Sequence, residues 1–354
     1  MAIESAVAHQ RFRWWAQVRY ALGLSLGIAA LFVLFSQRGN LRAAWHQLTR
    51  VSIPWLLGAV IAETMSIFIF AYVQRRVLKM AGTRIGVAPL FAISLANNAI
   101  ANTVPGEPAV SSAFRYRQYR RRGASRAGSG WTILTIIIAQ AIGMSSVLLV
   151  GVLVSLATSS NATNTRTALV GLFIVLGAGV VLLRRDLLLR FLGGIVRLAQ
   201  RLTGHPRGDI GERIVATLQR MREIELRPFD ALEIIAWATL VWGLDLACLL
   251  CSMEATHAPI PWHGIILAYG VAQIVAVLPI VPGGIGLVEG GLTVILVAYG
   301  STRVHALSSV LVYRAISFWF AVIVGWLSYT ALSLGARRKH TDSSAPRYHP
   351  RRTE

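Results

Sequence analysis

Long apolar runs alternate with short, arginine-rich polar segments along the chain. A helix needs about twenty mainly apolar residues to cross a hydrocarbon core of about 30 Å. Runs of this kind lie at 20–36, 53–73, 131–157, 167–183, 231–252 and 306–334. The pattern predicts an all-α, polytopic membrane protein with about six spanning helices.

Two further apolar stretches, 87–113 and 263–299, are interrupted by proline and glycine. The first is broken at Pro105-Gly106 and the second at the sequence PGGIG, residues 282–286. Proline removes a helical hydrogen bond and glycine weakens a helix interior, so neither stretch is expected to form one continuous helix. Ordinary spanning helices with proline kinks are the simpler alternative.

Charge distinguishes the flanks of these two stretches. Arginine and lysine occur on both sides of 87–113, whereas the flanks of 263–299 carry little positive charge. Basic segments stay on the cytoplasmic side. The first stretch is therefore expected to be a re-entrant hairpin from the cytoplasm and the second a hairpin from the outside. The halves 53–157 and 231–334 would then form an inverted repeat, which is common in transporters.

The same pattern divides the chain into segments. Residues 1–19 form a basic, cytoplasmic N-terminus without a cleavage signal, and 20–335 form the transmembrane domain. Within that domain, 184–230 alternates arginine and apolar residues at helical spacing, which predicts an interfacial linker, with a solvated connector as the alternative. Residues 336–354 are expected to be a disordered basic tail. We expect an inner-membrane protein with both termini in the cytoplasm.

Composition supports the membrane class. Hydrophobic residues make up 55% of the chain and charged residues 14%, while the net charge is +20. The arginines lie between apolar runs rather than on one solvated face, so nucleic acid is not an expected partner. The two cysteines sit in an apolar run and predict neither a disulfide nor a zinc site. The chain has no H-E-x-x-H and no P-loop, so we expect no enzyme, no metal and no cofactor.

Ionisable groups at membrane depth are costly, so they mark functional candidates. The charged candidates are Glu63, Glu107, Asp245, Glu289 and Arg314, accompanied by the amides Asn97, Asn98, Asn102, Gln140 and Gln273. Arg314 follows the start of its helix by about nine residues, which places it roughly 13 Å deep.

Glu289 follows the second break by one to two helical turns and is expected to lie beside Arg314. One interpretation of this pair is a buried latch between hairpin and helix. The other is that Arg314 contacts an anionic headgroup while Glu289 orients it. At the breaks, backbone amides at the start of a half-helix attract negative groups, although such glycines also simply turn a hairpin.

Two segments resemble a known family. They are VAQIVAVLPIVPGGIGLVEGGLTVILVAYG with ALSSVLVYRAISFWFAVIVGW, and upstream LANNAIANTVPGEPAVSSAFRYRQYRRRGAS. They resemble the flippase-like family that includes the transmembrane region of lysylphosphatidylglycerol synthase, in a form typical of actinobacterial members. The resemblance covers about 20–335, without the synthase domain. The site residues it implies are Pro282, Gly283, Gly284, Gly286, Glu289, Tyr313, Arg314, Pro105, Gly106, Glu107 and Arg115. Asn98 and Asn102 join this predicted site as polar residues beside the first break.

The resemblance implies a lipid translocase that moves an anionic or zwitterionic phospholipid, or a polyprenyl-phosphate-linked headgroup, across the inner membrane. Its expected partners are membrane lipids. The alternative is a non-transporting subunit that scaffolds or regulates a cell-envelope glycosyltransferase, in which case a cell-envelope biosynthetic enzyme is the partner. A membrane-embedded transferase is a third interpretation, and assembly into a homo-oligomer is left open.

Overall fold

A computed structural model describes residues 51–104, 109–158, 227–277 and 282–343, and within these ranges the protein is built from helices without strands. The α-helices are α3 (Ile53–Met80), α4 (Val87–Thr103), α5 (Ala109–Arg121), α6 (Arg126–Thr158), α10 (Pro228–Ala255), α11 (Ile265–Val277), α12 (Leu287–Ala298), α13 (Arg303–Arg314) and α14 (Ala321–Ser343). A 3₁₀ turn, Pro282–Gly284, precedes α12, and a π-helical segment, Ala315–Phe320, joins α13 to α14. The predicted all-α class is confirmed.

Four helical segments are long and apolar enough to cross a membrane. They are Ile53–Met80, Arg126–Ser155, Pro228–Ala255 and the continuous run Arg303–Leu334. They correspond to four of the six predicted apolar runs, and the other two, 20–36 and 167–183, lie outside the described residues. The predicted class of polytopic all-α membrane protein is therefore confirmed by the segments that the structure describes.

Helix ends extend beyond the predicted boundaries. Helix α10 begins at Pro228, inside the segment 184–230 that was expected to be a linker, and 184–226 lie outside the described residues. Helix α14 continues to Ser343, so the expected tail 336–354 begins as helix. Backbone hydrogen bonding continues into polar sequence as readily as into apolar sequence, and hydropathy alone does not mark where it stops.

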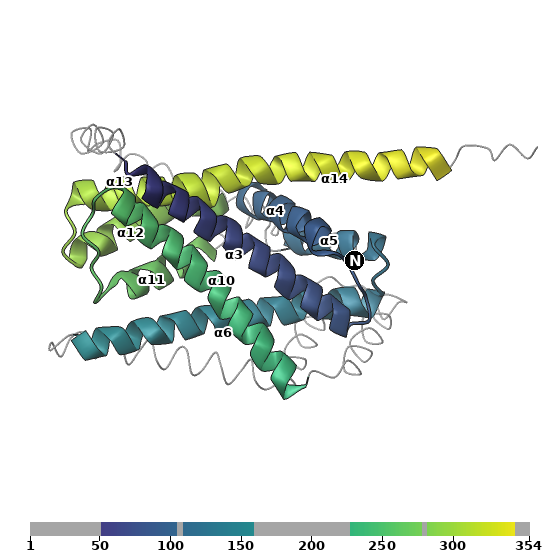
Figure 1. Cartoon of the computed structure of the whole chain (residues 1–354), viewed down its shortest axis with the longest axis horizontal. Helices are drawn as coiled ribbons and strands as arrows, with labels where there is room; N and C mark the ends of the chain where they lie inside the picture. The colour runs from purple at the N-terminus through teal and green to yellow at the C-terminus, as the bar shows by residue number, and fades with distance from the viewer. Residues whose placement is uncertain (1–50, 105–108, 159–226, 278–281, 344–354) are drawn as a thin grey trace, which may run out of the picture.

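Helices α3 and α10 form an antiparallel pair that is tied together at both ends (Figure 1). At one end the Ser52 amide donates to the Ala255 carbonyl at 2.9 Å. At the other end, Arg76 contacts Asp230 at 3.1 Å and Glu233 at 2.8 Å. Each helix has 28 residues, or about 42 Å, which matches a bilayer with its headgroup regions. The pair therefore fixes the relative height of the side chains it carries.

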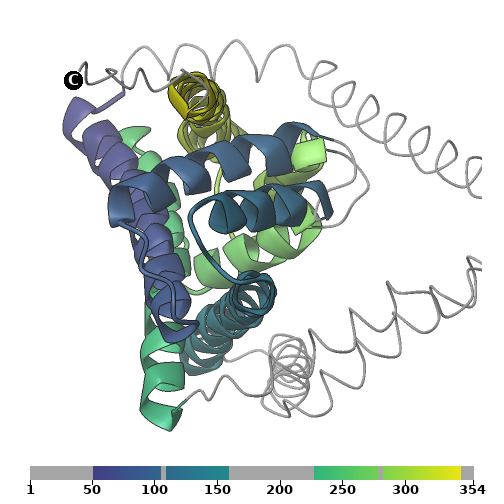
Figure 2. The same ribbon diagram turned by 90° about the vertical axis from the view of Figure 1, so that its right-hand side faces the viewer.

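The two broken stretches form helical hairpins that open toward opposite ends of this pair. In the first, α4 and α5 lie side by side (Figure 2), and the Tyr119 hydroxyl near the end of α5 donates to Gln74 near the end of α3 at 2.5 Å. In the second, the flanks of α11 and α12 meet where the rings of His263 and Tyr299 lie 5.5 Å apart. That contact belongs to the opposite end, where α10 finishes at Ala255.

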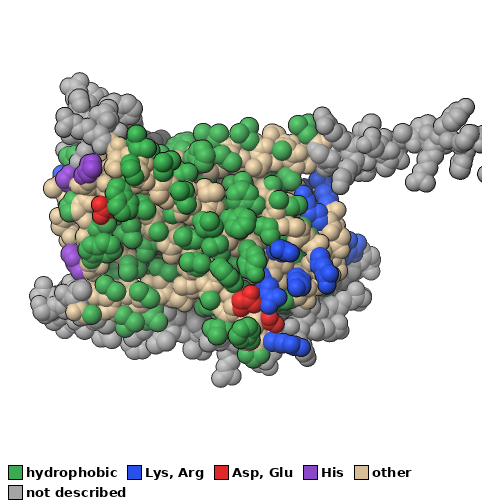
Figure 3. Space-filling model, viewed as in Figure 1, with side chains coloured by type: hydrophobic (Ala, Val, Ile, Leu, Met, Phe, Trp, Pro, Cys, Tyr) green, Lys and Arg blue, Asp and Glu red, His purple; other side chains and the backbone are tan. Residues whose placement is uncertain are grey.

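Charge is distributed unevenly over the surface. Lys and Arg side chains gather at one end of the visible face and His at the other, with a wide apolar surface between them (Figure 3). Lys79 lies in the last turn of α3, and Arg120 and Arg121 lie in the last turn of α5, so the basic end is where the first hairpin begins and finishes. Exposed apolar side chains include Ile61, Leu153 and Leu327, each more than half exposed. Such a surface suits contact with lipid chains.

Candidate functional site

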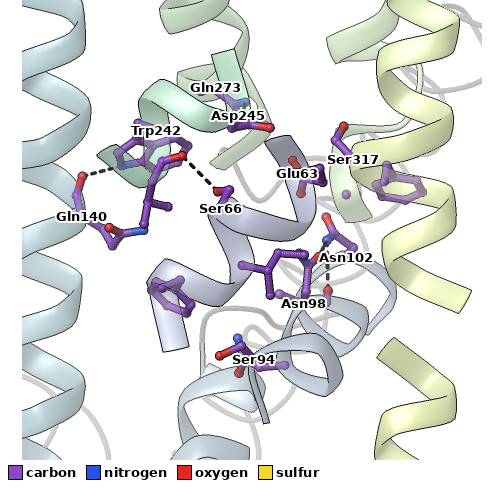
Figure 4. Close-up of a pocket in the computed structure, with 18 of the residues that line it drawn as sticks. Glu63, Ser66, Ser94, Asn98, Asn102, Gln140, Trp242, Asp245, Gln273 and Ser317 are labelled. Carbon is purple, nitrogen blue, oxygen red and sulfur yellow. Dashed lines mark hydrogen bonds between the residues drawn. The ribbon is translucent and has the colours of Figure 1, made fainter. Parts of the chain in front are cut away.

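A polar cavity of about 310 Å³ lies between α3, α4, α10 and α13 (Figure 4). Both hairpins contribute to it, the first through the end of α4 and the second through α11 and the turn at Gly283. Its polar lining consists of Glu63, Ser66, Ser94, Asn97, Asn98, Asn102, Gln140, Trp242, Asp245, Gln273, Tyr313, Arg314 and Ser317. The cavity concentrates most of the polar groups that the sequence placed at membrane depth.

An ion pair holds the second break against α13. The Arg314 Nε donates to Glu289 Oε1 at 2.7 Å, and Arg314 Nη2 donates to the Gly283 carbonyl at 2.9 Å. The guanidinium carbon lies 4.3 Å from the centre of the Phe318 ring, which adds a cation–π contact. Arg314 and Glu289 are each 7% exposed. The predicted proximity of these two side chains is present, and their arrangement has the features of the latch.

The glycines of the second break are needed for its backbone shape. Gly283, Gly284 and Gly286 have φ values of 63°, 62° and 83°, which lie in the left-handed region that side chains disfavour. The turn presents the Gly286 amide to Glu289 Oε2 at 2.6 Å, so the carboxylate caps the start of its own helix. One carboxylate thus joins the turn, α12 and Arg314.

The tips of the two hairpins meet inside the molecule. A side chain at Gly283 would come within 2.8 Å of the Asn102 carbonyl and would collide with the Phe318 ring. On α4, the Asn102 amide donates to the Asn98 carbonyl at 3.0 Å and to the Asn98 side chain. The two asparagines therefore form the cavity wall next to the second hairpin.

Asp245 is the centre of a hydrogen-bond cluster on the opposite wall. Its carboxylate accepts from the Tyr269 hydroxyl at 2.5 Å, from Gln273 Nε2 at 2.7 Å and from the Tyr313 hydroxyl at 3.0 Å. The Gln273 amide also donates to the Tyr313 oxygen at 2.9 Å. Three helices, α10, α11 and α13, are joined through this one carboxylate.

Glu63 lies beside this cluster on α3. Its side chain is 8% exposed, and its Oε2 is buried without a hydrogen-bond partner among the described residues. The Glu63 and Asp245 carboxyls line the same cavity and lie close enough to interact electrostatically. In Figure 4, Glu63 lies between Asp245 above and Asn102 below.

The charged groups of the cavity occupy one level. Glu63 lies about ten residues from the start of α3, and Asp245 lies about ten residues from the end of α10, at the same end of the antiparallel pair. Arg314 lies about eleven residues from the start of α13. All three are thus roughly 15 Å along their helices, which places them within the depth of the hydrocarbon core.

The cavity is lined by some of the predicted site residues and not by others. Asn98, Asn102, Gly283, Tyr313 and Arg314 line it. Glu289 and Gly286 join it through the ion pair and its cap, and Gly284 lies in the same turn. The side chain of Pro282, and all of Pro105, Gly106 and Glu107, lie outside the described residues. Arg115 is buried on α5 and does not line the cavity.

Several residues of the site carried too little signal in the sequence. Tyr269 and Trp242 look like ordinary aromatic residues of apolar helices, yet Tyr269 donates to Asp245, and Trp242 donates to the Gln140 carbonyl at 2.9 Å. The available signal was Asp245 itself, because a buried carboxylate requires donors nearby.

On α5, burial raises the pKa of Tyr119, so its hydroxyl remains a donor to Gln74.

The helices, their apolar surface and the polar cavity define a polytopic all-α membrane protein with a buried polar site. The sequence matches the family model described as the lysylphosphatidylglycerol synthase TM region over residues 20–325. The chain belongs to this family. No curated protein matches it.

Proposed function

We propose that the protein is a lipid translocase of the inner membrane that moves an anionic or zwitterionic phospholipid, or a polyprenyl-phosphate-linked headgroup. The observation that supports this most is the polar cavity at membrane depth, bordered by the tips of both hairpins. A headgroup that crosses a bilayer needs polar contacts on its way, and a hollow of this kind provides them. The acyl chains would remain in the surrounding lipid, against the apolar outer surface.

The two hairpins give this proposal its geometry. We propose that α4–α5 enters the membrane from the basic, cytoplasmic side and α11–α12 from the other side, as an inverted pair. Their four helices have 17, 13, 13 and 12 residues, and each is shorter than a spanning helix requires. In this arrangement both breaks would lie at the midplane, where many transporters bind their substrates. Both chain termini would then lie in the cytoplasm.

Arg314 is the best candidate for contact with a headgroup oxygen. Its Nε and Nη2 are held by Glu289 and Gly283, which fixes the guanidinium plane at the cavity wall. A planar donor group held in place in this way binds phosphate oxygens with little loss of entropy. The latch and the headgroup contact are therefore compatible roles of one side chain.

Reconstituted vesicles provide the test. Vesicles that contain the purified protein and fluorescent phosphatidylglycerol are treated with a membrane-impermeant quencher, which reports the fraction of probe that changes leaflet. We expect the wild-type protein to accelerate this exchange and Arg314→Lys, which keeps the charge but loses the planar fork, to slow it about tenfold or more. Arg303→Ala, an exposed arginine on the same helix, is the matched control and should behave like the wild-type protein.

Equal rates for Arg314→Lys and the wild-type protein would remove Arg314 from the mechanism. A wild-type protein that accelerates neither this probe nor a polyprenyl-phosphate probe would contradict transport itself.

The basic end of the molecule favours a second candidate function. Arginines and lysines of α3 and α5 gather there and offer a surface for an acidic cytoplasmic partner. Under this alternative the protein scaffolds or regulates a cell-envelope glycosyltransferase. Stoichiometric co-purification of such an enzyme, together with no lipid movement by the isolated protein, would favour it.

A further inference from the structure

Glu63 is a buried acid that the headgroup proposal leaves without a role. It projects from α3 into the cavity, and its Oε2 meets no donor among the described residues. Buried polar atoms in proteins nearly always have a partner, so an acid in this position requires an explanation. The ionisable group that interacts with it is the carboxyl of Asp245 on α10, which lines the same cavity.

The packing of α3 against α10 brings these two acids together. The helices are tied at one end through Ser52 and Ala255 and at the other through Arg76. Each acid lies about ten residues from the end of the pair where Ser52 contacts Ala255. A shift of α3 along α10 that separated the two carboxyls would also break the contacts at both ends of the pair. The proximity of Glu63 and Asp245 is therefore a property of the fold.

The charges around the pair are unbalanced. Two adjacent carboxylates in a poorly solvated site repel each other, and one of them is expected to retain a proton. Among the described residues, Arg314 is a cation that acts on Asp245, but it is already paired with Glu289. The other titratable groups facing the pair are Cys248, Tyr269 and Tyr313, and none of these carries a positive charge.

The hydrogen bonds show which acid holds the proton. Asp245 accepts from Tyr269, Gln273 and Tyr313, and donors of this kind stabilise the ionised form of a carboxylate. Glu63 Oε2 has no donor among the described residues. A proton on Glu63 turns it from an unsatisfied acceptor into a donor toward Asp245, which satisfies both acids.

We propose that Glu63 and Asp245 form a proton-binding pair that couples lipid movement to a transmembrane proton gradient. The proton enters from water in the cavity, resides on Glu63 in a hydrogen bond to Asp245, and leaves to water on the other side. Its loss leaves two carboxylates in contact, and their repulsion favours a different packing of the other cavity helices against the tied α3–α10 pair. This inference rests on the proposed transport of lipid, because a gradient can only drive a movement that takes place.

The first experiment measures proton binding without transport. Infrared difference spectra of the purified wild-type protein in detergent, recorded at two pH values and in heavy water, report protonated carboxyl groups. We expect one band of a buried protonated carboxyl at neutral pH that shifts in heavy water and is missing in Glu63→Gln. No such band, or an unchanged band in Glu63→Gln, would overturn the assignment whether or not the protein moves lipid.

The second experiment measures coupling. Vesicles containing the protein and fluorescent phosphatidylglycerol are given a pH gradient, and the rate of leaflet exchange is compared with the rate at equal pH. We expect the gradient to accelerate exchange several-fold in the wild-type protein and in Thr64→Ala. Thr64 is the neighbouring, exposed residue of α3, and its hydroxyl bonds only within its own helix. In Glu63→Gln the acceleration by the gradient should be lost.

Three outcomes separate the inference from the function on which it rests. The rate of lipid exchange by the wild-type protein could be independent of the pH gradient, or could respond only to a sodium gradient. Either result would overturn the proposed proton-binding pair without contradicting lipid transport. Acceleration that survives in Glu63→Gln would do the same. No exchange of any probe in the wild-type protein would contradict the transport function, while the infrared band would still decide whether the pair binds a proton.

Discussion

The two hairpins are held in the molecule by different kinds of side-chain contact. In the second, the break is closed by charge, because Glu289 joins Arg314 to the Gly286 amide. In the first, the break lies outside the described residues, and the side-chain hydrogen bonds that join the hairpin to α3 are between neutral groups: Tyr119 donates to Gln74, and Gln74 donates to Ser94 at 2.6 Å. An ion pair in a poorly solvated site is costly to break, whereas neutral hydrogen bonds contribute less each. The comparison indicates that the second hairpin is the more firmly held.

The largest expected effect comes from removing one member of the ion pair. Glu289→Ala leaves the Arg314 charge buried and unpaired, and it should lower the free energy of unfolding by about 3–5 kcal/mol. Thermal unfolding in detergent measures the change, with the exposed Arg303→Ala as control. The double variant Glu289→Ala/Arg314→Ala should recover part of the loss. If Glu289→Ala and Arg314→Ala each unfold like the wild-type protein, the second hairpin is not held by charge.

A backbone substitution in the same hairpin is expected to come next. Gly283→Ala requires a side chain at a φ of 63° and close to the Asn102 carbonyl, which should destabilise the protein by about 2–3 kcal/mol. Gly290→Ala is the control, because Gly290 is helical with open space around it. The control should be neutral or slightly stabilising. Equal stability of the two variants would show that the hairpin tips do not pack as described.

The first hairpin should respond more weakly. Tyr119→Phe removes the hydroxyl that donates to Gln74 Oε1 and should lower the free energy of unfolding by about 1–2 kcal/mol, because that buried acceptor loses its donor. Tyr116→Phe on the same helix should change it little. A loss as large as that of Glu289→Ala would erase the contrast between the two hairpins.

The smallest effect is expected at the basic end of the α3–α10 pair. The Arg76 side chain is 29% exposed, so its pairs with Asp230 and Glu233 are screened by solvent. Arg76→Ala should lower the free energy of unfolding by about 0.5–1 kcal/mol, and added salt should reduce the difference. The neighbouring exposed Arg75→Ala is the control. A cost comparable to that of the buried pair would show that exposure does not set the strength of these contacts.

The sequence predicted what depends on local chain properties. Hydropathy predicted the spanning segments that the structure describes, and proline and glycine predicted the breaks, since φ values near 60° require glycine at 283 and 284. The Glu289–Arg314 pair was also within reach, because a charge at membrane depth requires a partner.

Contacts that depend on how helices rotate against one another were not predictable. Nothing in the local sequence brings Glu63 to Asp245, or Tyr269 to the same carboxylate, until α3, α10 and α11 are packed. The packing of α5 likewise keeps Arg115 out of the cavity lining, although the family resemblance implied that Arg115 belongs to the site.

The most direct test of the account is water access to the cavity at membrane depth. Cysteine is introduced as Asn98→Cys in a background where Cys248 and Cys251 are replaced by serine or alanine, and labelling by a membrane-impermeant maleimide is measured in intact vesicles. The control is Ile61→Cys, which lies near Glu63 but on the outer surface of α3, 63% exposed. The account predicts rapid labelling at position 98 and slow labelling at position 61. Equally slow labelling of both would contradict a water-accessible polar cavity between the hairpins.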